Sequence, residues 1–105
     1  MRIILTTFTL AVLSAAALAA ADAKAGQTVY NQSCKTCHGP DGAGNPAIAK
    51  MMKVQLRDLK SPEVQAMSDA DLKTIITAGK GKMKPVPAAA GSADDVVAYL
   101  RSIKK

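Results

Sequence analysis

Apolar residues between positions 23 and 103 recur mostly at spacings of three and four, the period of an α-helix that buries one face. This pattern predicts five short helical segments, at residues 23–33, 47–53, 61–67, 68–79 and 92–103. No run of residues shows the strict apolar–polar alternation that is typical of a half-buried β-strand. The sequence therefore predicts a small all-α domain.

Serine residues mark where three of these helices begin. Ser61 precedes a proline, which suits the first helical position, while Ser68 and Ser92 are each followed three residues later by an aspartate. The glycine at position 79 is expected to end the fourth helix. The expected buried positions are Gly26, Val29, Tyr30 and Ser33 in the first helix, Leu72, Ile75 and Ile76 in the fourth, and Val96, Val97, Tyr99, Leu100 and Ile103 in the last.

Two segments are too rich in glycine and proline to form regular elements. The first, GPDGAGNP, covers residues 39–46, and the second, KGKMKPVP, covers residues 80–87. We expect both to be loops, so that the helices are connected by one long loop after residue 38 and another around Met83.

The first 21 residues resemble a cleavable leader more than part of the domain. A positive start at Met1-Arg2, an apolar middle from Ile3 to Leu18 and a run of alanines are the marks of a secretory signal peptide. Cleavage after Ala21 or Ala23 fits equally, which leaves a domain over residues 22–105. The alternative is that the apolar segment is retained as a membrane anchor. The sequence therefore predicts an exported, periplasmic protein.

Composition indicates that the exported domain needs more than its own side chains to be stable. Without a leader of 21 or 23 residues it has about 82 to 84 residues, no tryptophan and only two tyrosines. A single core becomes marginal at this size, so a staple or a large apolar guest is expected. The formal net charge is +6, but export, few aromatics and no known motif argue against nucleic-acid binding.

Both cysteines and the only histidine of the chain lie within residues 34–38, which read CKTCH. A structural zinc site needs four ligands, and a thioredoxin-like pair needs a βαβ context, so neither fits. A disulfide between Cys34 and Cys37 would close a loop too short to stabilise much, and it would leave His38 unexplained. Cys-x-x-Cys-His is the attachment sequence of c-type haem, with two thioether bonds and the histidine on the iron.

The residues around this motif extend the similarity over nearly all of residues 22–105. Gly26 and Tyr30 before the cysteines, CHGPDGAGNPA, IITAGKGKMKP and DDVVAYLRSIK resemble successive parts of a class I cytochrome c, the small bacterial mono-haem kind. The resemblance implies a fold of four to five short helices wrapped around one covalently attached haem c. It also implies that the first and last helices cross through Gly26 and Tyr99.

The second axial ligand of the iron is less well determined by the residues themselves. With one histidine in the chain, the candidates are a methionine, a lysine or no ligand. Met67 reads as part of the core, and Met51 and Met52 are adjacent, so at most one of them points inward. Met83 lies in an irregular segment between glycines and prolines that can fold over a flat ring, and the resemblance implies that it is the ligand.

The resemblance also implies secondary contacts. It suggests that the carbonyl of Pro46, or of the nearer Pro40, accepts a hydrogen bond from His38. Independently of the resemblance, Arg57 or a neighbouring lysine is a candidate partner for a haem propionate; the alternative for each is an exposed ion pair or no pair.

Three functions remain open on this basis. The first is a soluble, monomeric electron carrier with His38 and Met83 on the iron, which is not an enzyme. The second is a haem enzyme or gas sensor with an open sixth position, and the third is a haem subunit docked in a larger oxidoreductase. Lys80, Lys82 and Lys84 would make the loop over the iron basic and attract redox partners with acidic docking surfaces. Membrane association is expected only if the leader is retained.

Overall fold

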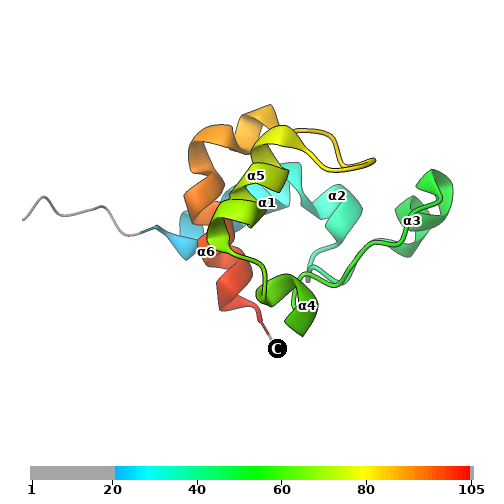
Figure 1. Ribbon diagram of the computed structural model, residues 1–105, viewed down its shortest axis with the longest axis horizontal. Helices are drawn as coiled ribbons and strands as arrows, with labels where there is room; N and C mark the ends of the chain where they lie inside the picture. The colour runs from blue at the N-terminus through cyan, green and yellow to red at the C-terminus, as the bar shows by residue number, and fades with distance from the viewer. Residues whose placement is uncertain (1–20, 105) are drawn as a thin grey trace, which may run out of the picture.

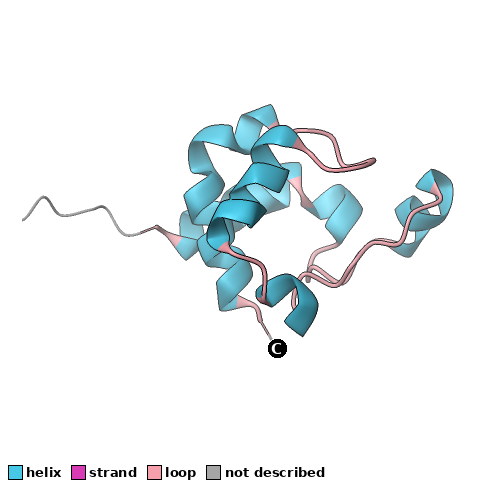
Figure 2. Cartoon of the chain, in the orientation of Figure 1, coloured by secondary structure: helices cyan, strands magenta, loops and turns pink. Residues whose placement is uncertain are grey.

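A computed structural model describes residues 21–104 and confirms an all-α fold. Figure 2 shows helices and loops without any strand in this part of the chain; one isolated bridge joins Lys80 and Met83. None of the helices between residues 21 and 104 has the length and apolar character needed to cross a membrane. The elements are α1 (Ala23–Ser33), α2 (Lys35–His38), α3 (Pro46–Met52), α4 (Pro62–Gln65), α5 (Asp69–Ala78), the 3₁₀ helix η1 (Pro87–Ser92) and α6 (Ala93–Ser102). Most of the predicted leader, residues 1–20, lies outside the described residues.

The predicted helices exist at nearly the predicted bounds because local capping defines them. Asn45, Ser61 and Ser68 precede α3, α4 and α5, and each side chain accepts hydrogen bonds from backbone amides of the first turn. Asp22 does the same for α1. These bonds satisfy amides that have no partner inside the helix, so a short polar residue at this position determines where the helix begins.

The predicted cap at Ser92 is wrong. The chain enters α6 directly from η1, which the sequence did not predict, and Ser92 has ψ 15° and makes no capping hydrogen bond. Ser61 and Ser68 have ψ 153° and 155°, the extended conformation that brings a hydroxyl to the following amides. Because η1 imposes a turned backbone on Ser92, the same residue type cannot act as a cap there.

The first and last helices of the described chain form the main packing unit of the fold. Gly26 of α1 lies against the backbone of α6, so close that a Cβ on Gly26 would be 1.9 Å from the Asp95 carbonyl oxygen. The predicted contact with Tyr99 is therefore only partly right. The ring of Tyr99 packs instead on that of Tyr30, with centroids 5.2 Å apart and planes inclined by 56°.

The apolar core lies around this pair of helices, and α5 and η1 cover it. Figure 1 shows α4 below and α2 to one side of these helices. The core comprises Tyr30, Val64, Leu72, Ile76, Ala89, Ala93, Val96, Val97, Tyr99 and Leu100. Four other positions that we expected to be buried are half-buried: Val29, Ser33, Ile75 and Ile103.

Helix α3 differs from the other elements because none of its residues is buried. It projects from the body of the molecule between two nearly extended segments (Figure 1). Met51 on this helix is 71% exposed, whereas the neighbouring Met52 is half-buried. The expectation that at most one of the two methionines points inward agrees with this difference.

Candidate functional site

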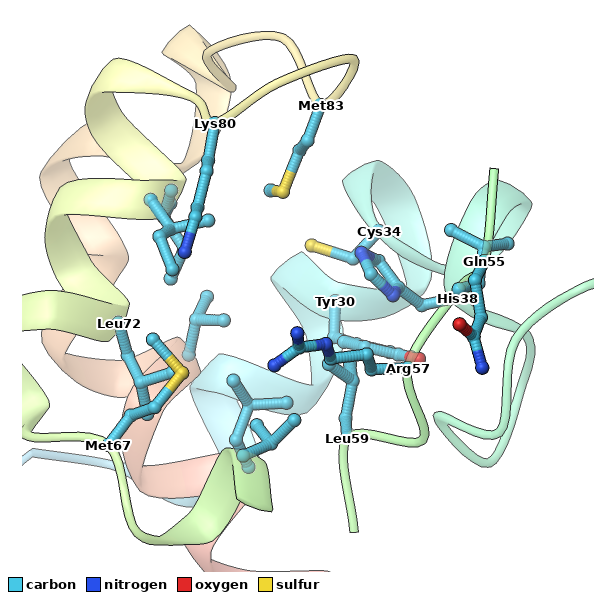
Figure 3. A pocket seen from close by; sticks show the side chains of 16 residues that line it. Tyr30, Cys34, His38, Gln55, Arg57, Leu59, Met67, Leu72, Lys80 and Met83 are labelled. Atoms are coloured by element: carbon cyan, nitrogen blue, oxygen red, sulfur yellow. The ribbon is translucent and has the colours of Figure 1, made fainter. Parts of the chain in front are cut away.

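Residues of α1, α2, α4, α5 and α6 line an apolar cavity of about 280 Å³. Its volume is close to the lower end of the roughly 300–1,000 Å³ that ligand pockets occupy. Cys34, His38 and Met83, three of the four predicted site residues, line it together (Figure 3). Much of the remaining wall is aliphatic and includes Leu56, Leu59, Val64, Leu72, Ile76 and Leu100.

Cys34 and His38 reach the cavity through one helical turn, which also carries Cys37. Cys34 follows the last residue of α1 and precedes α2, and its carbonyl accepts a hydrogen bond from the His38 amide at 3.0 Å. Positions three and four apart share a face of a helix, so this turn groups Cys34 with Cys37 and His38. Both thiols are free and half-buried, and Cys34 lines the cavity whereas Cys37 is not among the lining residues.

Burial holds the imidazole of His38 in its neutral form. Desolvation lowers the pKa of this side chain below its ordinary value, and a neutral imidazole is the form that binds a metal ion. Its Nδ1 atom is buried and has no hydrogen-bond partner among residues 21–104. The predicted bond to the carbonyl of Pro46 or Pro40 is thus absent from this part of the chain.

Burial also affects the thiol of Cys34. Desolvation raises its pKa, and the neighbouring Cys37 thiol raises it further. Cys34 is therefore a protonated, half-buried thiol rather than an activated nucleophile of the kind found in cysteine enzymes.

Met83 is held in a closed turn rather than in a loose loop. The amide of Lys80 donates to the Met83 carbonyl at 2.9 Å, and the amide of Met83 donates to the Lys80 carbonyl at 3.0 Å. Gly81 within the turn and Gly79 before it have φ of 57° and 78°, which favours glycine at both positions. Figure 3 shows that the Met83 side chain extends from this turn toward Cys34 and His38.

Other candidate ligands are distributed unequally around the cavity. Met67, in the connection between α4 and α5, lines the cavity and also packs against the core, whereas Met51 and Met52 are not lining residues. Lys80 and Arg57 are the cationic side chains that line it within residues 21–104. Both are labelled in Figure 3, where they come from different segments of the chain.

Tyr30 contributes to the site in a way that the sequence did not predict. Its side chain is fully buried and lines the cavity, and its hydroxyl donates to the carbonyl of Gly39 at 2.6 Å. This bond ties α1 to the residue that follows His38. Burial, with the nearby Tyr99 as a smaller cause, raises the pKa of Tyr30 well above its usual value, so the hydroxyl stays a donor.

The donor set suits a large apolar ligand that carries a metal ion. A thiol, a neutral imidazole and a thioether are soft or borderline ligands, and much of the wall around them is aliphatic. The cationic side chains of Lys80 and Arg57 would complement carboxylates on such a ligand. A haem fits these features. Among the described residues, Nδ1 of His38 is the one buried side-chain nitrogen or oxygen without a hydrogen-bond partner.

Comparisons with known proteins agree with this assessment. Residues 21–100 match the family model described as "Cytochrome C oxidase, cbb3-type, subunit III". The chain is 33% identical over 92 residues to cytochrome c-554(547) of Halothiobacillus neapolitanus, which covers 81% of this chain and all of that protein. Among solved structures, the KustC0563 c-type cytochrome is similar, with a TM-score of 0.64 and 30% identity over 76% of this chain and 98% of its own.

Proposed function

Because this chain belongs to the c-type cytochromes, in the family described as cytochrome C oxidase, cbb3-type, subunit III, we propose that it is an exported carrier of single electrons. Electron transfer on haem c follows from membership of the family. Our proposal adds the ligands, the location and the way in which the protein meets its partners. Cys34 and Cys37 would hold the haem by thioether bonds, and His38 and Met83 would bind its iron.

The main support for this proposal is that Cys34, His38 and Met83 line one apolar cavity although Met83 is remote from the others in sequence. An iron bound by histidine and methionine changes its charge by one without exchanging ligands, and the thioether raises its reduction potential. The protein supplies a largely aliphatic wall and, in His38 and Met83, the two side chains that would bind the iron. This arrangement favours the passage of single electrons over the binding of a substrate at the metal.

The way in which the carrier meets its partners is a further part of the proposal. Lys80, Lys82 and Lys84 surround Met83, and all three are exposed. Charges of one sign near a redox centre accelerate encounters with oppositely charged proteins at low salt. We therefore expect partners with acidic docking surfaces and a rate of electron transfer that falls as the salt concentration rises.

A docked haem subunit is the second candidate function, and one observation favours it. The family model that matches is described as a subunit of an oxidase. If this protein is such a subunit, it should co-purify with a larger complex in high salt. A free carrier should be released under the same conditions.

The test of haem binding combines mass and absorption. Protein made in a host that matures c-type cytochromes should have the mass of the chain plus one haem, and Cys34→Ala/Cys37→Ala should lack the added mass. The same measurement shows whether the leader is removed after Ala21 or Ala23. A mass equal to that of the bare polypeptide would contradict the whole proposal.

Ligation by Met83 has its own test in the ferric spectrum. We expect a weak band toward the red end of the visible spectrum, which reports a bond between methionine sulfur and ferric iron, and we expect Met83→Ala to abolish it. Met51→Ala is the matched control, because Met51 is exposed and does not line the cavity. If the band is lost in Met67→Ala and kept in Met83→Ala, the ligand is Met67 instead.

A further inference from the structure

One side chain that lies outside the cavity organises part of its wall. Arg101 of α6 reaches the C-terminal end of α4 and the connection that follows it. Its Nη1 donates to the Gln65 carbonyl at 2.8 Å and to Gln65 Oε1 at 3.2 Å, and its Nη2 donates to the Met67 carbonyl at 2.6 Å. Nε and Nη2 also donate to Asp69 Oδ1, at 3.1 and 2.8 Å.

Gln65 extends this arrangement to two further segments. Its Nε2 donates to the Leu59 carbonyl at 2.9 Å and to the Leu100 carbonyl at 2.8 Å. Leu59, Met67 and Leu100 all line the cavity. Through bonds to backbone carbonyls, the Arg101–Gln65 pair therefore joins three parts of the cavity wall, although neither of these side chains lines the cavity.

These hydrogen bonds stabilise α4, which is too short to be stable through its own backbone hydrogen bonds. α4 has only four residues, and the carbonyls at the end of a helix have no partner within it. Arg101 binds one such carbonyl, that of Gln65, and also the carbonyl of Met67 in the connection that follows the helix. Hydrogen bonds from a charged donor are about twice as strong as neutral ones. Without the guanidinium, both carbonyls would need water, and the connection that carries Met67 would be free to move away from the cavity.

We propose that Arg101, acting through Gln65, is a positioning residue of the redox site: it fixes the Leu59–Met67 wall and thereby limits the water that reaches the haem. The inference rests on the proposed function, since it concerns the haem that Cys34 and His38 would hold. Water near the iron stabilises the ferric state, which carries one more positive charge than the ferrous state. Loosening this wall should therefore lower the reduction potential.

The experiment compares holoprotein variants by redox titration. Arg101→Lys is the decisive variant, because it keeps the positive charge while a single ammonium cannot replace a fork of three nitrogens. We expect its reduction potential to lie below that of wild type. Arg101→Gln should show a larger decrease, since the lost charge adds to the lost geometry. Gln65→Met, which retains chain length and removes the side-chain amide, should shift the potential in the same direction.

Two matched controls distinguish a specific loosening of the cavity wall from a general loss of protein stability. Lys73 of α5 and Asp94 of α6 form another link between the same region and α6, with N and O atoms 2.8 Å apart, and neither residue lines the cavity. Neither Asp94→Asn nor Asp69→Asn should lower the potential, because loss of a negative charge can only disfavour the ferric state. Asp69→Asn removes the ion pair but not the bonds from Arg101 to the two carbonyls. Equal shifts in Arg101→Lys and Asp94→Asn, or no shift in Arg101→Lys, would overturn the proposal.

Hydrogen exchange supplies a readout that does not depend on the potential. The Met67 amide donates to the Val64 carbonyl at 3.1 Å and reports opening of this connection. In Arg101→Lys it should exchange about ten-fold faster or more, because hydrogen bonds of a charged donor are worth at least that factor. The Val54 amide, bonded to Ala49 in the region of α3, should be unaffected. If haem is attached but both readouts are unchanged, the inference fails while the proposed function stands.

Discussion

Tyr30 shows how one buried hydroxyl connects the framework of this protein to its redox site. The ring is part of the core, and its hydroxyl binds the Gly39 carbonyl directly after His38. Loss of one partner of a buried hydrogen bond leaves the other partner unsatisfied, at a cost of about 1–3 kcal/mol. Tyr30→Phe should therefore lower the free energy of unfolding by about that amount, as measured by urea denaturation of the holoprotein.

The same side chain predicts a dependence on alkaline pH. The pKa of Tyr30 is raised in the folded state, whereas in the unfolded state it is about 10. Above about pH 10 the unfolded chain loses this proton and the folded chain keeps it, so stability falls as pH rises. Tyr30→Phe lacks this contribution. The difference in free energy of unfolding between wild type and Tyr30→Phe should therefore narrow from about pH 8 to pH 11, because the wild type loses stability. A constant difference over this range would contradict the assignment.

At the residue scale, the sequence predicts a candidate site most directly where the proposed members are contiguous. Cys34, Cys37 and His38 form one motif, and a single helical turn is enough to group them. The resemblance to cytochrome c pointed to Met83, but the closed turn that holds it depends on reciprocal backbone bonds that the residue types do not specify. The contacts of Arg101 join residues 32 to 36 positions apart, and no local pattern indicates such pairs.

At the scale of elements, the contact of α1 with α6 is the most sensitive to substitution. A Cβ at Gly26 would meet backbone atoms of Asp95, so it could fit only if the two helices moved apart. Overpacking costs about 1–3 kcal/mol where side chains can adjust, and we expect Gly26→Ala to cost more than about 3 kcal/mol. Gly91→Ala is the control, because nothing lies within 4 Å of a Cβ there. Thermal unfolding of both variants should show a large effect only at Gly26.

Two serines that precede helices, one a cap and one not, give a second test at this scale. Ser68 accepts a hydrogen bond from the Asp71 amide at 3.0 Å, so Ser68→Ala should destabilise the protein by about 1 kcal/mol. Ser92 makes no capping bond, and Ser92→Ala should stay within about 0.5 kcal/mol of wild type. Chemical denaturation would distinguish the two, and equal losses would mean that the backbone angle at Ser92 does not prevent capping.

Helix bounds were predictable wherever the capping signal was local, as at α5, and less so where neighbouring elements compete. The proline at position 87 was read as a loop residue, yet it begins η1, and η1 then determines how α6 starts. The one-turn helix α2 was also not predicted as a separate element. Short helices of this kind depend on the residues before and after them more than on their own composition.

For the molecule as a whole, the small core and the cavity predict that the fold depends on its ligand. Only ten apolar residues of the described chain are buried, and Tyr30 and Val96 are the largest that are fully so. A ligand that binds only the folded state stabilises it, and its removal leaves facing apolar walls without contacts. Cys34→Ala/Cys37→Ala, made without haem, should therefore lose the cooperative thermal transition of the holoprotein in circular dichroism. An equally cooperative transition at the same temperature would contradict this dependence.

The close contact of α1 with α6 also has a consequence for the order in which the protein matures. The Asp22 amide binds Asp95, 73 residues later, so α1 receives its packing partner only after nearly all of the chain has been made. An isolated helix of 11 residues is marginally stable in water. Until α6 has been made, residues 34–38 would therefore belong to an unfolded segment that an enzyme attaching the haem could bind. Late closure would keep both thiols accessible until the last helix has been made.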